Sequence, residues 1–319
     1  MIFFCRIMSK SAVCSYVQGY ERYLLLEEGL SAHTRKAYRE DLQRFLDYAA
    51  ARGLDVLCAR LSDFHDFVYE QHAAGLSARS IARVVSGLRS FYRYLELDGY
   101  LPDNPTALLE TPRIGRHLPT VLTLDEVNRI EAAVDQSETE GLRNLTMVEL
   151  LYSAGLRVSE LCLLRLSDLY LTDGYLHVTG KGRKVRLVPL APSAARLLER
   201  WLEQRTDITP KPGEEDYVFL SFRRRAHLST VMVFHIVKEL ARAAGIRKTI
   251  SPHTFRHTFA THLLEGGANL RVIQTLLGHE SITTTEIYTH LDLQGLRRQV
   301  LEHFPRNLPS SSVIPDKDA

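Results

Sequence analysis

The sequence predicts a mainly α-helical protein of two domains, an N-terminal four-helix bundle and a mostly helical second domain with a small β-sheet or hairpin. Apolar residues recur at helical spacing through the first hundred residues. A proline-rich segment, residues 100–119, then interrupts this pattern. Alternating apolar and polar runs are clearest in residues 174–189, where they flank a glycine-containing turn. A chain of 319 residues is long enough to bury two separate cores.

Four helices are expected in the first domain, each closed by a nearby glycine. Their expected ranges are residues 11–30, 33–51, 62–74 and 78–97. Helices of this length bury their apolar faces by packing on one another. We therefore expect a bundle within residues 11–109, preceded by a disordered extension of residues 1–10.

The second domain is expected to span residues 121–305. Four prolines in residues 100–119 indicate a linker, and we place it at residues 110–120. Thr123 and Glu126 form a capping-box pattern, which predicts that a helix begins after Thr123.

Strands and the chain end complete the expected order of elements. Residues 174–189 are expected to form a hairpin, and residues 217–220 a further short strand. The polar residues 306–319 are expected to be a disordered tail.

Composition excludes some classes of protein. Lysine and arginine number 40 against 38 acidic residues, so a formal net charge of +2 does not by itself indicate nucleic acid. No run of eighteen or more apolar residues occurs, and no membrane insertion is expected. The four cysteines lack the spacing of a metal site or a disulfide framework. We expect reduced thiols in a cytoplasmic protein.

Basic residues gather in two places. On the expected helix at residues 78–97, one side is apolar and the other carries Arg79, Arg83, Arg89 and Arg93. Such a stripe is most often a solvated face, but here no glutamate lies at helical spacing before Glu96. Arginines one or two turns apart can follow a DNA backbone. An expected loop of the second domain holds Arg223, Arg224 and Arg225. Two basic clusters in two domains fit a clamp around duplex DNA.

Two segments near the end of the chain hold candidate chemistry. In Ser251-Pro-His-Thr-Phe-Arg-His257, a serine cap and a first-turn proline place His253 and Arg256 beside free amides that can bind an anion. In the second segment, Tyr288 follows His279 by nine residues. An enzyme that attacks a phosphodiester without a metal can use a phenol as nucleophile, with an arginine and two histidines to assist at the phosphate.

Each of these residues also has a structural interpretation. A single tyrosine is most often a core or interface residue, and we expect His257 and His262 to satisfy hydrogen bonds rather than take part in chemistry. A zinc-protease motif is excluded, because Thr254 stands where the motif needs glutamate.

Two further motifs give the sequence a family resemblance. Arg157 lies in Leu156-Arg-Val-Ser-Glu-Leu161, and Lys181 lies in Gly180-Lys-Gly-Arg-Lys184. Arginine, lysine, His-x-x-Arg, Leu-Gly-His and tyrosine follow in this order. The chain thereby resembles the tyrosine site-specific recombinases of the phage-integrase family, and is most like the XerD branch of the bacterial Xer recombinases. The resemblance covers about residues 17–305.

The resemblance implies a catalytic set and a mechanism. The set consists of Arg157, Lys181, His253, Arg256, His279 and the nucleophile Tyr288. It implies strand cleavage through a 3′-phosphotyrosyl intermediate, with no metal, ATP or other cofactor. Lys181 is the candidate for protonating the departing 5′ oxygen, and His253 for assisting proton removal. The N-terminal bundle is expected to be the SAM-like core-binding domain, which binds DNA.

The resemblance also implies partners. These are duplex DNA with paired half-sites, a related recombinase protomer in a cyclic heterotetramer of two pairs, and a septal DNA translocase that acts in chromosome dimer resolution at cell division. The last helix, residues 291–304, has one apolar side with no later chain to cover it, so we expect it to reach the adjacent protomer; docking on its own domain is the alternative. Alternative functions are an integrase of a mobile element or a catalytically dead architectural DNA-binding protein.

Overall fold

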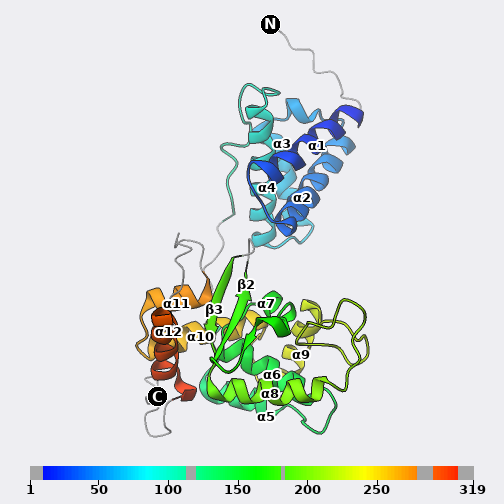
Figure 1. Ribbon diagram of the computed structural model, residues 1–319. Helices are drawn as coiled ribbons and strands as arrows, with labels where there is room; N and C mark the ends of the chain where they lie inside the picture. Colours follow the sequence, from blue (N-terminus) through cyan, green and yellow to red (C-terminus); the bar gives the residue numbers. More distant parts are fainter. Residues whose placement is uncertain (1–9, 113–119, 181–183, 279–289, 308–319) are drawn as a thin grey trace. The chain divides into compact units, whose positions relative to one another are not determined.

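The computed structural model describes residues 10–112, 120–180, 184–278 and 290–307, with the backbone alone at residues 10–14 and 290–294. The chain divides into two compact units, residues 1–117 and 118–319 (Figure 1). Each unit has its own hydrophobic core. The predicted class, mainly helical with one small sheet, is confirmed.

The N-terminal unit contains the four predicted helices. They are α1 (Lys10–Leu26), α2 (Ala32–Ala51), α3 (Leu61–Ala73) and α4 (Ala78–Leu97), with a 3₁₀ turn η1 at Val56–Cys58. Serines begin two of them, because the hydroxyls of Ser31 and Ser77 each accept a backbone N–H three residues on, at 3.2 Å. Glycines follow three of the helices in the left-handed conformation that β-carbons disfavour, at Gly53, Gly75 and Gly99.

Aromatic rings fill the core of this unit. The ring centroids of Phe45 and Phe64 lie 5.1 Å apart, and those of Phe64 and Tyr92 lie 4.9 Å apart. The Tyr92 hydroxyl donates to the Val56 carbonyl at 2.8 Å, so its burial leaves no unsatisfied donor. Leu109 is fully buried in the same core, and the chain after α4 therefore still packs on this unit.

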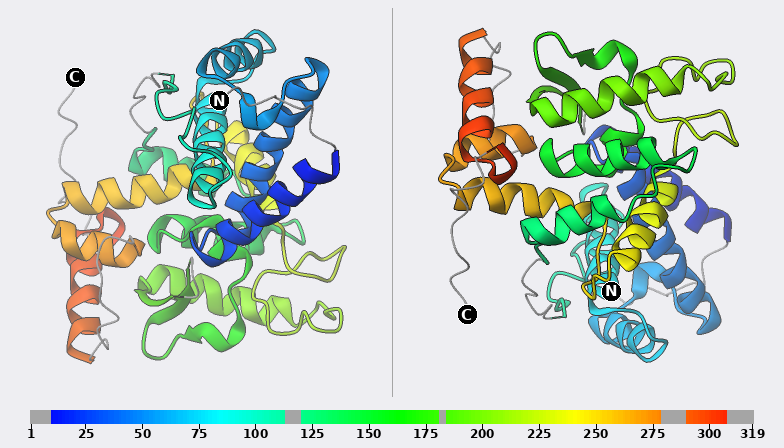
Figure 2. Two further views of the ribbon diagram at one scale, coloured as in Figure 1. Left: turned by 90° about the horizontal axis from the view of Figure 1, so that it is seen from above. Right: turned by 90° about the horizontal axis from the view of Figure 1, so that it is seen from below.

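The C-terminal unit is built from eight helices among the residues described (Figures 1 and 2). They are α5 (Leu124–Ala132), α6 (Gly141–Ser153), α7 (Val158–Cys162), α8 (Pro192–Arg205), α9 (Thr230–Ala243), α10 (Pro252–Glu265), α11 (Leu270–Leu277) and α12 (His290–His303). The predicted capping box begins α5: Thr123 N–H donates to Glu126 at 2.8 Å, and Glu126 N–H donates to the Thr123 hydroxyl at 3.2 Å.

A three-stranded antiparallel sheet lies in this unit. Its strands are β1 (Leu169–Tyr170), β2 (Tyr175–Thr179) and β3 (Val185–Pro189), in the order β1-β2-β3. The predicted hairpin is confirmed as β2 and β3, whereas β1 is too short to produce an alternating pattern. The strand predicted at residues 217–220 is wrong: only isolated bridges form there, at Tyr217 and Leu220.

The last helix packs on its own unit, contrary to the expectation that it leaves an apolar face uncovered. Leu296, Val300 and Phe304 are buried in the core of the C-terminal unit. Figure 2 shows α12 beside α11, at one end of α10. The Phe304 ring centroid lies 4.8 Å from that of Tyr152 and 5.4 Å from that of Phe259. Hydrophobic burial within the chain therefore satisfies this face.

The described fold also continues past residue 305, where the tail was expected to begin. Residues Pro305–Asn307 form a 3₁₀ turn, η4. Arg306 donates to Glu131 of α5 at 2.7 Å and also forms an ion pair with the buried Glu149 of α6. This arginine fastens the end of α12 to two other helices.

One of the two cysteines whose side chains the structure describes differs from expectation. Cys58 is disulfide-bonded, so the expectation of four reduced thiols is wrong there. Cys162 is a buried free thiol, and burial raises its pKa to about 12. In the part of the chain that the structure describes, no helix is both long and apolar enough to cross a membrane.

Candidate active site

The start of α10 presents two of the candidate residues in different environments. Pro252 occupies the first turn, and the Thr254 hydroxyl accepts the Ser251 N–H at 3.1 Å. Phe255 and Phe259 are buried, which fixes the rotation of the helix. His253 is exposed, whereas Arg256 is only 9% exposed.

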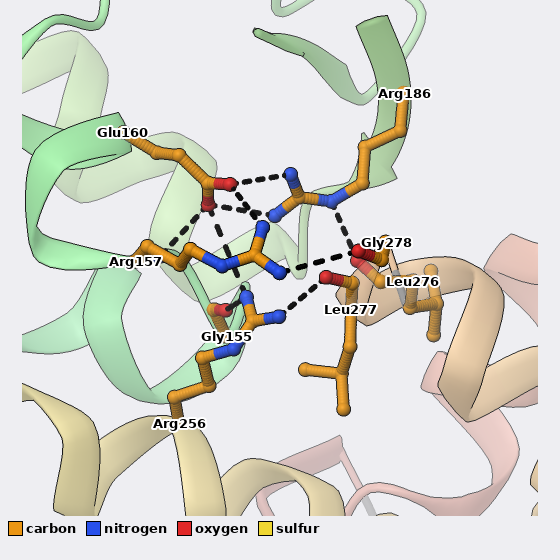
Figure 3. Close-up of polar contacts among 8 residues, drawn as sticks. All are labelled: Gly155, Arg157, Glu160, Arg186, Arg256, Leu276, Leu277 and Gly278. Atoms are coloured by element: carbon orange, nitrogen blue, oxygen red, sulfur yellow. Dashed lines mark hydrogen bonds and ion pairs between the residues drawn. The ribbon is translucent and has the colours of Figure 1, made fainter. Parts of the chain in front are cut away.

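A single buried carboxylate gathers three arginines from separate elements (Figure 3). Glu160, in α7, receives Arg157 Nη1 at 2.7 Å and two parallel bonds from Arg186 of β3, each of 2.8 Å. Arg256 Nη1 of α10 lies 3.9 Å from the same carboxylate. The structure thus brings Arg157 and Arg256, which are far apart in the sequence, into one cluster.

The same three guanidinium groups also bind the end of α11. Arg186 donates to the Leu276 carbonyl at 2.7 Å, Arg256 to the Leu277 carbonyl, and Arg157 to the Gly278 carbonyl at 3.2 Å (Figure 3). The last carbonyls of a helix have no partners within the helix and form the negative end of its dipole. Three cations are therefore stabilised at this end.

The electrostatics of the cluster leave a net positive site. Burial alone would raise the pKa of the Glu160 carboxyl, but the hydrogen bonds and charges of Arg186 and Arg157 outweigh it and hold this pKa at about 2. Burial and the neighbouring Arg157 lower the pKa of Arg256 to about 10, which still leaves it protonated at neutral pH. Three positive charges and one negative charge give the cluster a formal charge of +2.

His253 differs from these cations in its charge state. Partial loss of hydration, together with the neighbouring Arg256 and Arg157, lowers the pKa of this exposed side chain, so the neutral imidazole is favoured at pH 7. A neutral imidazole can accept a proton. His262 is buried, and its Nδ1 lies 2.9 Å from the Tyr152 hydroxyl, consistent with the structural role expected for it.

Lys181, His279 and Tyr288 lie outside the described residues. The residues directly before the first two, however, are at the cluster. A β-carbon built at Gly180 would lie 3.6 Å from Glu160 Oε1, and one built at Gly278 would lie 3.1 Å from Arg186 Cδ. Both segments therefore leave the described fold beside the same ionic cluster. Among the described residues, no group of three or more histidine, cysteine, aspartate or glutamate side chains could hold a metal ion.

Sequence reasoning missed Glu160 and Arg186. Glu160 stands three residues after Arg157, and its carboxylate accepts the Arg157 N–H at 2.8 Å, the spacing of a capping box. Arg186 shares the buried side of β3 with Val188. Alternation gave no signal for it, because Val185, Leu187 and Pro189 form the more apolar side of this strand in the sequence and leave Arg186 on the other side.

The basic stripe of α4 has partners that helical spacing could not reveal. Arg83 forms two bonds, of 2.8 and 3.0 Å, with the fully buried Asp41 of α2, which also pairs with Arg44 at 3.1 Å. Arg89 donates to the Leu109 carbonyl. The remaining predicted contact residues are exposed: Arg79, Arg93, Arg223, Arg224 and Arg225.

Comparisons with known proteins agree with this arrangement. Residues 120–294 match the Phage integrase family, and residues 17–99 match the Phage integrase, N-terminal SAM-like domain. The chain is 42% identical over 293 residues to Tyrosine recombinase XerD of Listeria monocytogenes serotype 4b (strain F2365), covering 91% of this chain and 98% of that protein. It is 43% identical over 284 residues to Tyrosine recombinase XerD of Pseudomonas aeruginosa (strain PAO1), covering 89% and 95%.

A solved structure supports the fold. The chain resembles a lambda integrase dimer bound to a COC′ core site with a TM-score of 0.64 at 24% identity, covering 86% of this chain and 99% of that one. One conclusion follows from the two matched domains, from the similarity to relatives along about nine-tenths of the chain and from the clustered arginines. The chain belongs to the phage integrase family of tyrosine recombinases, enzymes of site-specific recombination that cleave and rejoin DNA.

Proposed function

We propose that this recombinase cleaves DNA with Tyr288 as nucleophile and forms a 3′-phosphotyrosyl intermediate. A phenol of pKa about 10 is almost wholly protonated at pH 7, so attack requires proton removal and stabilisation of the phosphate. Arg157 and Arg256 supply planar donors for the non-bridging oxygens, and His279 adds a further donor. His253 assists proton removal, and Lys181 protonates the departing 5′ oxygen.

One observation carries this proposal: the three-arginine cluster at Glu160. A net charge of +2 suits a phosphodiester whose negative charge grows during attack. Arg157 keeps 31% of its side chain exposed, which allows a phosphate to reach it. The neutral state favoured for His253, one turn before Arg256, supports its role as proton acceptor.

The similarity to the relatives supports a more specific proposal for the substrate and partners. Their shared name, Tyrosine recombinase XerD, supports resolution of chromosome dimers at cell division. On this proposal the chain binds duplex DNA with paired half-sites through both units and assembles with a related recombinase protomer into a cyclic heterotetramer of two pairs. A septal DNA translocase would activate the complex.

The first test is Tyr288→Phe. The variant should bind DNA as the wild type does and form no covalent complex, because only the attacking oxygen has been removed. Denaturing electrophoresis of each protein with nicked duplex DNA measures the adduct. An adduct of undiminished yield in the variant would remove Tyr288 from the nucleophile's role.

The second test identifies the DNA. Covalent complexes captured from dividing cells and sequenced should map to one chromosomal site made of two inverted half-sites. Capture at the ends of a mobile element would instead support the integrase alternative. Specific binding without any captured adduct would favour an architectural protein.

A further inference from the structure

Arg186 is a buried arginine outside the catalytic set proposed above. It is 6% exposed, and its guanidinium makes three hydrogen bonds within 2.8 Å, two to Glu160 and one to the Leu276 carbonyl. Bidentate pairing of this kind fixes both the position and the orientation of the Glu160 carboxylate relative to the guanidinium (Figure 3). Arg186 thereby joins three segments: the β2–β3 hairpin, α7 and the end of α11.

Each of these segments leads to a residue of the proposed chemistry. Arg186 pairs with Val178 in the hairpin, and the Gly180 N–H donates to the Lys184 carbonyl at 2.8 Å where the hairpin closes. Lys181 follows Gly180 in the sequence. Leu276 is three residues before His279, and Glu160 holds Arg157 through Nη1. One guanidinium, that of Arg186, therefore connects the three segments that lead to these residues.

Arg186 also determines how strongly Glu160 attracts the other two arginines. With Arg186 present, both carboxylate oxygens are occupied by its fork, and the cluster has a formal charge of +2. Without it, the charge falls to +1. Among the residues that the structure describes, the buried carboxylate then keeps Arg157 and the more distant Arg256, at 3.9 Å, as ion-pair partners. Both would be drawn towards Glu160 and away from an arriving phosphate.

We propose that Arg186 is a positioning residue for DNA cleavage, which holds Arg157, Arg256 and the end of α11 in their reactive arrangement by neutralising and orienting Glu160. This inference rests on the proposed function of the cluster. Its effect should fall on the rate of the chemical step rather than on the affinity for DNA, because the exposed arginines proposed to bind DNA, on α4 and at residues 223–225, lie outside the cluster. Displacement of a reacting group by about 1 Å can cost about a hundredfold in rate.

The test compares Arg186→Lys, Arg186→Gln and a matched control, Arg205→Lys. Lysine keeps the charge but not the fork, and glutamine loses the charge. Arg205 is also buried, at 8% exposed, and donates to the carbonyls of Tyr217 and Glu215 rather than to the cluster. The probe is a duplex oligonucleotide carrying the captured site, nicked so that rejoining is prevented. Trp201, the single tryptophan, is buried in the C-terminal unit and reports folding of each variant.

At saturating DNA, Arg186→Lys should form the covalent complex about tenfold to a hundredfold more slowly than wild type, with affinity within about twofold. Arg186→Gln should be slower still if it folds, and Arg205→Lys should cleave at the wild-type rate despite a comparable loss of stability. If Arg186→Lys cleaves at the wild-type rate, or if both lysine variants slow in proportion to lost stability, Arg186 is only structural and the inference is wrong. If the wild-type protein itself forms no covalent adduct through Tyr288, the proposed function is wrong instead.

Discussion

Glu160 is the residue on which the charge of the site depends. Its pKa of about 2 lies below the ordinary value of 4.5, because ion pairs with Arg186 and Arg157 outweigh the cost of burial. A group with a depressed pKa in the folded state stabilises the fold above its unfolded pKa. That stability is lost as the pH falls through the folded pKa. The shift corresponds to about 3 kcal/mol.

Glu160→Gln should therefore change the acid sensitivity of the C-terminal unit. The wild type should lose about 3 kcal/mol more of its free energy of unfolding than the variant between about pH 5 and pH 2, since the variant cannot titrate at this position. Urea unfolding followed by Trp201 fluorescence at several pH values measures this difference. Parallel curves for the two proteins would contradict the role assigned to the carboxylate.

At the scale of elements, α12 is held by its own unit. Phe304 is fully buried against Tyr152 and Phe259, and Arg306 pairs with Glu131 and Glu149 just beyond the helix. The fold loses much of its stability when a buried aromatic side chain is truncated or when one partner of a buried ion pair is removed. The last helix is therefore a structural part of the C-terminal unit in the state described.

Phe304→Ala tests this docking. Truncation of a buried phenylalanine should lower the free energy of unfolding of the C-terminal unit by about 3 to 5 kcal/mol. Leu264→Ala is the control, because Leu264 on α10 is 53% exposed and its truncation should change stability by about 0.5 kcal/mol or less. Equal stabilities for Phe304→Ala and wild type would mean that α12 is undocked in solution.

At the scale of the whole molecule, basic residues of both units should contribute to DNA binding. Arg83 is held by the buried Asp41 while 45% of its side chain stays exposed, an arrangement that orients a guanidinium without covering it. Arg223 belongs to the exposed cluster of the C-terminal unit. Each contact with a phosphate releases counterions, so each contributes to the salt dependence of binding.

Arg83→Gln and Arg223→Gln should each reduce the slope of log affinity against log salt by about one, and the double variant by about two. Arg200→Gln, an exposed position on α8, is the matched control and should leave the slope unchanged. Fluorescence anisotropy over a series of salt concentrations gives these slopes. An unchanged slope for Arg83→Gln would show that this arginine serves only as the partner of Asp41.

The sequence by itself determined the local elements and the family. Four helices in the first unit, the cap at Thr123 and the β2–β3 hairpin follow from apolar periodicity and from side chains that bond their own backbone within a few residues. The motifs around Arg157 and Arg256 carried the family resemblance, which the comparisons confirm. Such features depend on neighbours in the chain, and a linear pattern contains them.

Tertiary structure alone decided which distant residues meet. Arg186 bonds Glu160 across 26 residues, and Arg256 bonds Gly155 across 101. The acidic partner of Arg83 comes from another helix, 42 residues away. The apolar face of α12 was visible in the sequence, but whether its own unit or a neighbour covers it depends on the shape of the surface that receives it. Ion pairs and packing depend on distances set by the whole fold, which the local spacing of residues does not specify.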